Sequence, residues 1–410
     1  MGKQKNIPQL RFPEYEGEWE SKTIQEIFDF KNGLNKEKEF FGKGTPIVNF
    51  TDVFKENALT KENIRGLVEV TEKEKVNYSA KKGDVFFTRT SETINEIGMA
   101  ATLIDEIADC VFSGFVLRAR QKSNDLDDQF KKYCFSTEPI RREIITKSSF
   151  TTRALTSGTL LNKVILKFPY SKNEQQKIAS FFTAIDQKIS QLKQKKNLLE
   201  QYKKWVMQKI FSQEIKFKDD NGQEFTKWEK FELGDLLLHK AIRNKGCKVD
   251  LVLSVSNTKG FITQSEQFDN HRVASIDVSN YKIVSKDDFA YNPSRINVGS
   301  IARLTDYKEG IVSPMYVVFG LRELLNAIFF ENWIDTHKFK YLVRISCSGS
   351  VRDSLSFEDM CNFPIKLPSQ PEQTKIANFL SAIDEKINYT QKQIEKVEVW
   401  KKGLMQQMFV

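Results

Sequence analysis

The sequence is poor in the residues that build metal centres and redox sites. Its 410 residues include only three histidines and five cysteines. The cysteines are odd in number and form no Cys-x-x-Cys pair, which argues for reduced thiols and against a zinc site. The three histidines are scattered and show no ligand spacing. We therefore expect that this chain binds no metal.

The motifs of catalysis and of membrane insertion are also missing. The sequence has no phosphate loop and no glycine-rich nucleotide fingerprint. The tripeptide Asn292-Pro293-Ser294 lacks the second proline and the aromatic residue expected of an adenine methyltransferase. No apolar run approaches 18 residues and no signal-peptide pattern occurs, which predicts a cytoplasmic protein with no membrane partner. The pattern favours a protein that binds and does not catalyse.

The formal charge of +9 is distributed unevenly along the chain. Residues 173–211 hold eight basic and three acidic groups, whereas residues 212–370 hold 21 of each. Because the globular parts are close to neutral, net charge alone is weak support for a nucleic-acid partner. Any surface for a polyanion must come from local clusters of Lys and Arg.

A segment near the middle of the chain occurs a second time at the end of the sequence. Residues 171–211 align without a gap with residues 369–409, and 18 of the 41 positions are identical. Each copy begins with Ser-x-x-Glu, the spacing of a helix capping box. We interpret the chain as a tandem duplication in which each unit ends in a long helix.

Both copies of the repeat carry a coiled-coil pattern. Alternating steps of four and three residues from Ile178 and from Ile376 meet apolar side chains at eight of ten positions in each copy. A parallel pair would force residues 212–368 to travel back along a helix of about 40 residues, roughly 60 Å. We therefore predict that the two helices pack on each other in antiparallel orientation.

The remainder of the sequence predicts two α+β domains. Short apolar runs alternate with turn residues in both halves of the duplication. The expected strands are residues 46–50, 84–88, 98–104 and 111–117, with counterparts at 251–255, 288–291, 299–304 and 312–319; short helices are expected at 127–135 and 322–336. The predicted order is a first domain at 1–170, a first helix at 171–212, a second domain at 213–368 and a second helix at 369–410, with pseudo-two-fold symmetry.

A basic stretch rich in hydroxyl groups occurs late in each domain, at residues 141–153 and 338–352. Lys and Arg supply phosphate contacts, while Ser, Thr and backbone amides position them. A solvated helix face with its loop would have a similar composition, and this alternative stays open. We favour phosphate contacts for Arg153 and Arg352. The DNA-binding candidates here are Lys147, Ser148, Thr152, Arg153, Arg344, Ser348, Ser350 and Arg352.

The loop after a central strand of each domain is the second candidate surface, at residues 87–91 and 291–297. Asn and Arg are the side chains that pair bidentately with adenine and guanine in the major groove. An ordinary polar turn is the alternative. We favour base reading for Arg89 and Arg295. The candidates in these loops are Arg89, Thr90, Asn292, Arg295 and Asn297.

The layout resembles the specificity (S) subunit of type I restriction–modification systems across essentially the whole chain. The resemblance rests on the helical motif that runs from Glu174 to Ile189 and on its copy from Glu372 to Ile387. Smaller motifs that look like those of the family are Lys167-Phe168-Pro169, Lys366-Leu367-Pro368, Lys82-Gly83-Asp84-Val85 and Gly349-Ser350-Val351-Arg352.

The resemblance implies two target-recognition domains that each read part of a bipartite DNA site, with the helices setting the spacer. It also implies two modification subunits, which use S-adenosylmethionine, and two restriction subunits, which depend on ATP and Mg. None of these cofactors is expected on this chain. The runner-up interpretation is a coiled-coil structural adaptor that joins two protein-binding domains without DNA. A self-sufficient restriction–methylation enzyme is disfavoured because the catalytic motifs are absent.

The long helices are also the predicted docking surface for the modification subunits, because a pair of helices leaves faces uncovered. The residues predicted at the helix and partner interfaces are Ile178, Phe181, Phe182, Ala184, Ile185, Ile189, Ile376, Phe379, Leu380, Ala382, Ile383 and Ile387.

Overall fold

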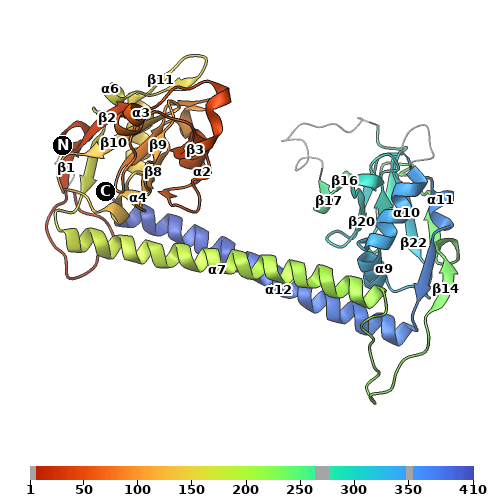
Figure 1. Ribbon diagram of the computed structural model, residues 1–410. Coiled ribbons are helices and arrows are strands. Elements are labelled where there is room, and N and C mark those ends of the chain that lie inside the picture. Colours follow the sequence, from red (N-terminus) through yellow and green to blue (C-terminus); the bar gives the residue numbers. More distant parts are fainter. Residues whose placement is uncertain (1–5, 264–276, 348–353) are drawn as a thin grey trace. The chain divides into compact units, whose positions relative to one another are not determined.

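The structure is a computed structural model that describes residues 6–263, 277–347 and 354–410. The chain divides into two compact units (Figure 1). The first unit comprises Met1–Lys193 and Lys392–Val410, and the second comprises Gln194–Gln391. Each unit therefore contains one domain body together with part of each long helix.

A five-stranded sheet forms the centre of the first unit (Figure 1). Its strand order is β2–β10–β6–β8–β4, and only the β4–β8 pair is parallel. All four side chains of β6 are buried, which explains its unbroken apolar start. The strands are β2 (Phe28–Asn32), β10 (Val116–Gln121), β6 (Val85–Thr88), β8 (Ala100–Leu103) and β4 (Ala58–Leu59).

Shorter pairings and helices complete the first domain body. The paired strands are β1 (Glu20–Thr23) with β13 (Ile165–Phe168), β3 (Phe41–Val48) with β5 (Leu67–Val68) and β9 (Val111–Phe112), and β7 (Thr90–Ser91) with β12 (Ala154–Leu155), which also pairs with β11 (Ser149–Phe150). The helices are α1 (Ile24–Ile27), α2 (Phe50–Lys55), α3 (Glu72–Asn77), α4 (Asp128–Cys134), α5 (Glu138–Lys147) and α6 (Gly158–Leu161), with the 3-10 turns η1 (Lys38–Phe40) and η2 (Ile94–Glu96).

Among the described residues, the second unit repeats this plan with fewer strands. Its central sheet has the antiparallel order β15–β22–β19–β20, which corresponds to β2–β10–β6–β8 of the first unit. The two bodies therefore share a topology that their sequences conceal. The elements are β14 (Glu229–Glu232), β15 (Leu237–Lys240), β16 (Leu253–Ser256), β17 (Gly260–Thr263), β18 (Lys282–Ser285), β19 (Phe289–Tyr291), β20 (Ile301–Arg303), β21 (Glu309–Val312), β22 (Val317–Leu321), β23 (Pro364–Leu367), α9 (Ala327–Ile334), α10 (His337–Cys347), α11 (Phe357–Cys361), η3 (Leu233–Asp235) and η4 (Ile296–Val298).

One strand prediction is wrong in the same way in both units. Residues 111–117 and 312–319 were each expected to form one strand, but each segment is interrupted by a turn. The backbone amide of Val116 donates to the carbonyl of Ser113, and that of Tyr316 donates to Ser313. The turn sends the chain from one sheet to the next, so β9 and β10, like β21 and β22, belong to different sheets.

The long helices α7 (Lys172–Phe211) and α12 (Gln370–Met408) lie side by side and antiparallel within each unit (Figure 1). In the first unit, Asp186 of α7 pairs with Lys401 and Lys193 pairs with Glu398. In the second unit, Lys203 pairs with Asp384. Lys203 and Lys401 are equivalent in the repeat, as are Asp186 and Asp384, so one ion pair is built twice. The predicted fold class is confirmed.

The apolar seam predicted for the helices is buried inside the chain itself. The seam residues pack into the core of their own unit, because each helix covers the other and the domain body. Phe181, Phe379 and Ile387 are partly buried, whereas Ala184 and Ala382 are exposed. The buried members of the predicted interface are Ile178, Phe182, Ile185, Ile189, Ile376, Leu380 and Ile383.

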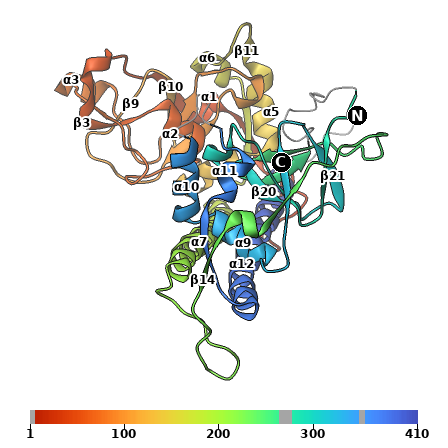
Figure 2. The same cartoon turned by 90° about the vertical axis from the view of Figure 1, so that its right-hand side faces the viewer.

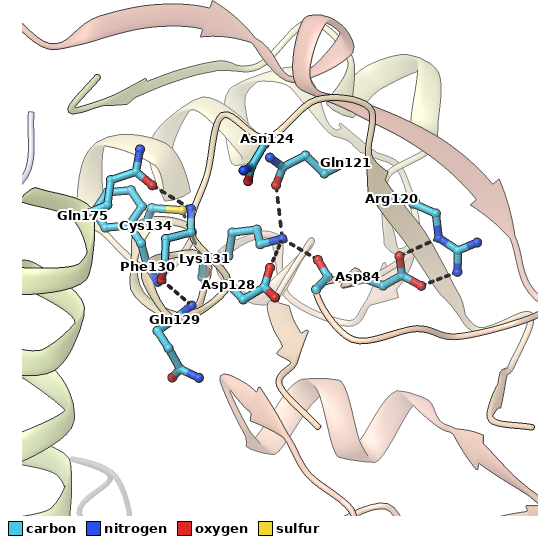
Figure 3. Close-up of polar contacts among 12 residues, drawn as sticks. Asp84, Arg120, Gln121, Asn124, Asp128, Gln129, Phe130, Lys131, Cys134 and Gln175 are labelled. Atoms are coloured by element: carbon cyan, nitrogen blue, oxygen red, sulfur yellow. Dashed lines mark hydrogen bonds and ion pairs between the residues drawn. The ribbon is translucent and has the colours of Figure 1, made fainter. Parts of the chain in front are cut away.

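A buried glutamine fastens each long helix to its domain body. The amide oxygen of Gln175 accepts from the backbone amide of Asp127 at 2.7 Å (Figure 3). The amide nitrogen of Gln175 donates to the carbonyls of Asp125 and Pro169, at 2.9 and 2.8 Å. Gln373 makes the equivalent three bonds in the second unit, at 2.8–3.0 Å. Each helix is therefore held at its first turn to the start of the helix α4 or α9.

The glutamate before each glutamine does not complete the predicted capping box. Glu174 accepts a bidentate ion pair from Arg11 and a bond from the indole of Trp19. Glu372 accepts from the indole of Trp228 at 3.1 Å, and burial raises the pKa of this carboxyl group. The glutamate of the Ser-x-x-Glu motif therefore joins the helix to its domain body, because a tryptophan near the start of each domain donates a hydrogen bond to its carboxylate.

We predict that Gln175→Ala and Gln373→Ala each lower the free energy of unfolding by about 1–3 kcal/mol, because buried backbone groups lose their partners. Chemical denaturation measures the effect. Gln187→Ala, at an exposed position of α7, is the matched control. Equal stability of the buried-site variants and the control would contradict the anchoring role.

Candidate nucleic-acid interface

The first unit brings its two candidate stretches together on one small sheet. Strand β12 pairs with β7, so that Leu155 lies opposite Thr90. The hairpin of β11 and β12 places Thr152 and Arg153 at an exposed turn beside this pair. Figure 2 shows β11, α5 and α6 together at one end of the first unit. Thr90 and Leu155, 65 positions apart in sequence, therefore lie on one surface.

Arg153 is exposed and forms a weak ion pair with Glu92, at 3.7 Å between the two side chains. Glu92 follows β7 directly, so this exposed pair lies next to the pairing of β7 with β12. An exposed pair of this length contributes little stability, so the Arg153 guanidinium can exchange this partner for a phosphate at low cost. Glutamate beside it could accept from cytosine N4, as acidic groups do in base readout.

Arg89 lies at a polar recess. One guanidinium nitrogen donates to the carbonyl of Gly114 at 3.0 Å, and the side chain is half-buried. The recess has a volume of about 440 Å³ and is also lined by Lys31, Lys122 and Asn162. The side-chain oxygen of Asn162 is buried and unpaired among the described residues. Arg89 is thus positioned by the backbone carbonyl of Gly114, and the remaining donors of its guanidinium group are left to bind a ligand.

The basic stretch that includes α5 is structural over its first part. Ser148 ends α5, and its hydroxyl donates to the carbonyl of Ile144 at 2.7 Å. Lys147 is the last residue of α5, where a cation is favourable. Arg141 is half-buried and its guanidinium donates to three backbone carbonyls, so within the domain this residue serves a structural contact. The local sequence could not show this, because the carbonyls lie more than 40 positions away.

In the second unit, the loop after β19 is built as a tight polar turn. The side-chain oxygen of Asn292 accepts from the amide of Ser294, and the backbone oxygen accepts from Arg295. Arg295 and Asn297 are exposed beyond this turn. Asn292 therefore shapes the loop, while Arg295 and Asn297 are presented to solvent.

Helix α10 and the loop with η4 line one cavity of about 540 Å³. Asn297 lines it from the loop, and Lys340 and Val343 line it from α10. Arg344 follows on the exposed side of α10, 5.5 Å from the ring of Tyr341. The structure thus brings Asn297 and α10 together, as it brings Thr90 and β12 together in the first unit. Ser348, Ser350 and Arg352 lie outside the described residues.

Exposed apolar side chains accompany both candidate surfaces, and sequence reasoning missed them. Phe150 of β11 is 57% exposed and Tyr341 of α10 is 54% exposed. Aromatic rings beside cations provide flat surfaces for bases or sugars. The signal was present, since both rings lie inside the basic stretches, but their exposure follows only from the fold.

The small Lys82-Gly83-Asp84-Val85 motif belongs to the architecture. Asp84 accepts a bidentate pair from Arg120, and the carbonyl of Gly83 accepts from the buried ammonium of Lys131 at 2.6 Å (Figure 3). Gly83 has a φ of +86°, and a side chain there would collide with the carboxylate of Asp128. The second unit has a corresponding bond from Lys240 to Asp288. Lys82 is exposed, whereas Gly83, Asp84 and Val85 are buried and hold the central sheet against α4.

Two absences hold within the described part of the chain. No cluster of three or more His, Cys, Asp or Glu side chains there could hold a metal ion. Among the same residues, no helix has the length and apolar character needed to cross a bilayer.

The sequence profile described as "Type I restriction modification DNA specificity domain" matches residues 16–201 and 226–399. The chain belongs to this specificity family. Each match covers one domain body and a large part of the long helix that follows it. The duplication seen in the fold is therefore a duplication of the family's domain.

Two relatives from Methanocaldococcus jannaschii are similar to this specificity chain over nearly its whole length. The putative type I restriction enzyme MjaX specificity subunit is 22% identical, covering 98% of this chain and 95% of its own. The type I restriction enzyme MjaIX specificity subunit is 24% identical, covering 92% and 89%.

Solved structures show the same fold at low identity. The type I restriction–modification S subunit from M. genitalium aligns with a TM-score of 0.56 and 15% identity, over 98% of this chain and 99% of that one. A chain from a study of complex assembly and conformational transition in the type I system aligns with a TM-score of 0.53 and 12% identity, over 94% and 96%.

We predict different effects for the two arginines of the first domain of this specificity chain. Arg153→Ala should weaken DNA binding by the assembled complex for all sequences, and should flatten the logarithmic salt dependence by about one unit. Arg89→Ala should instead relax one position of one half-site, at a cost of about 1–3 kcal/mol. Salt-titrated affinities and methylation-site profiles measure both.

Arg65→Ala is the matched control, because Arg65 is exposed on the same unit but far in sequence from both stretches. Unchanged affinity and unchanged motif for both variants would show that the DNA surface lies elsewhere. A binding curve that does not respond to salt would favour the adaptor interpretation.

Proposed function

We propose that this chain is the DNA-recognition subunit of a type I restriction–modification complex, and that each domain body reads one half of a bipartite site. The proposal rests on one observation: the chain contains two copies of the specificity domain, and both copies have the same strand order in their central sheets. Each body presents a polar loop after its central strand beside a second, basic element. Two separate reading surfaces suit a site with two specified halves.

The chemistry of the complex is assigned to partner subunits. S-adenosylmethionine would bind to modification subunits, and ATP and Mg would bind to restriction subunits. This chain would supply positioning and sequence reading, and its own residues would take no part in methyl transfer or cleavage. The missing phosphate loop and nucleotide fingerprint support this division of roles.

The exposed faces of the long helices are the proposed docking surfaces for the modification subunits. Ala184 and Ala382 are equivalent in the repeat and both are exposed. Tyr202 and Trp400 are a second equivalent pair, 46% and 53% exposed. Large apolar groups left open on a helix are a common mark of a protein interface. Because each surface occurs twice, two modification subunits are the stoichiometry that the repeat favours.

We expect that the purified chain alone neither methylates nor cleaves DNA, because it carries no recognised cofactor motif. Incubation with labelled S-adenosylmethionine and host DNA, with and without the modification subunit, measures methyl incorporation. Incorporation by the chain alone would refute the division of roles. Incorporation at a bipartite motif only when both polypeptides are present is the predicted result.

Ala184→Glu together with Ala382→Glu should weaken binding of the modification subunit by at least about tenfold, because an interface would trap unpaired carboxylates. Ser190→Glu with Asn388→Glu is the matched control at equivalent exposed positions on another face. Native mass spectrometry reports the stoichiometry. Ala184→Glu alone and Ala382→Glu alone should each retain one bound modification subunit. Undiminished binding of two subunits by the double variant would show that the docking surface lies elsewhere.

A further inference from the structure

A single half-buried arginine fixes the candidate recognition loop of the first domain. Arg141 of α5 donates to the backbone carbonyls of Asn95, Ile97 and Gly98, at 2.5–3.0 Å. These three carbonyls belong to η2 and the residues that follow it. The segment begins immediately after β7, the strand that carries Thr90. A planar guanidinium is suited to such a task, because its donors are held in a rigid fork.

The same helix closes on the loop through an apolar contact. Gly98 has a φ of +61°, and a β-carbon there would lie 2.6 Å from a methyl group of Ile144. Burial lowers the pKa of Arg141 to about 10, because the cation is held away from water beside neutral carbonyls. A buried charge of this kind is costly unless its hydrogen bonds are satisfied. The position of the segment is therefore tightly determined.

The second domain has the same helix and turn but lacks this contact. Thr137 and Thr336 precede α5 and α10, and each hydroxyl donates to the helix before it. Arg141 and Lys340 are the fourth residues of their helices, between buried apolar neighbours in both cases. Lys340 is directed to the side chain of Asp335, at 3.3 Å, and both groups are exposed.

In the second domain, a cavity borders the corresponding helix and loop. The cavity of about 540 Å³ lies between η4 and α10, and Asn297, Gly299, Lys340 and Val343 line it. Asn297 is the second residue of η4, as Asn95 is of η2. The ammonium of Lys340 pairs with Asp335, which also lines this cavity, so the residue equivalent to Arg141 does not tie its helix to the loop.

We propose that Arg141 is a positioning residue for DNA recognition, which holds the segment from β7 to β8 so that one half-site is read by a rigid loop. The corresponding loop of the second domain is tied to β16, where the Ser300 hydroxyl donates to the carbonyl of Val255 at 2.9 Å, but among the described residues it has no equivalent of the Arg141 fork, and its position relative to α10 adapts on binding. The proposal rests on the proposed function, because it explains how a DNA-recognition subunit discriminates bases in one of its half-sites. Arg141 acts through these carbonyls and itself contacts no DNA.

The test compares methylation motifs from cells that carry the modification subunit with three forms of this chain. Arg141→Lys introduces the residue that the second domain uses. It should reduce discrimination at one position of one half-site, from the usual factor of about 5–150 toward unity. The affected half should be the one altered by Arg89→Ala. The other half-site and the yield of complex should stay as in the unmodified protein.

Hydrogen exchange on the unmodified complex without DNA gives an independent arm that needs no variant. Amides of residues 94–98 should exchange at least about tenfold more slowly than those of residues 296–299. Lys340→Arg should slow exchange at 296–299, because a guanidinium can close the open cavity. Equal exchange of the two segments would overturn the proposal, as would an unchanged motif from a stably assembled Arg141→Lys complex.

The possible outcomes distinguish a failure of this proposal from a failure of the proposed function. If the unmodified complex yields no bipartite motif, the proposed function fails irrespective of Arg141. If the unmodified motif is bipartite and Arg141→Lys relaxes both halves equally, the loop-specific role fails while the function stands. If Arg141→Lys does not assemble, the exchange measurement on the unmodified protein decides.

Discussion

The buried amide at the first turn of each long helix is the constraint on which both units depend. Gln175 and Gln373 each join three backbone groups that belong to the end of a domain body and to the helix that follows the central sheet. A glutamine can do this because it offers an acceptor and two donors on one planar group. The tryptophan–glutamate contact beside it adds a second fixed point. Within each unit, the domain body that carries the recognition loops is thereby fixed to the long helix and is not attached to it by a flexible linker.

The two units keep the same contacts between helices and central sheets, whereas their recognition loops differ. The ion pair between Asp186 and Lys401 has its copy between Lys203 and Asp384, and the central sheets keep one strand order. The loops after β6 and β19 differ in length and in composition. One is held by Arg141, whereas the other borders an open cavity. A protein that has to recognise a new DNA sequence while still binding the same partner subunits would be expected to vary these loops and to keep the long helices.

The sequence predicted the parts of the structure that are encoded locally. The helical seam follows from a pattern of three and four residues, and every seam position in both copies is at least partly buried. Contacts across long separations could not be predicted in this way. The pairing of Thr90 with Leu155 joins the two candidate stretches of the first domain, and no local pattern specifies it. Arg141 was read with its basic neighbours because its carbonyl partners are distant in sequence.

The most direct test of the account is an exchange of one domain body. The second body, bounded by Trp228 and the end of β23, would be replaced with the corresponding body of another specificity subunit, while α7 and α12 stay unchanged. Methylation profiling of cells with the modification subunit should then show a motif in which one half is new and the other half is retained. A motif that changes in both halves, or one that does not change at all, would contradict the claim that each domain reads its own half-site.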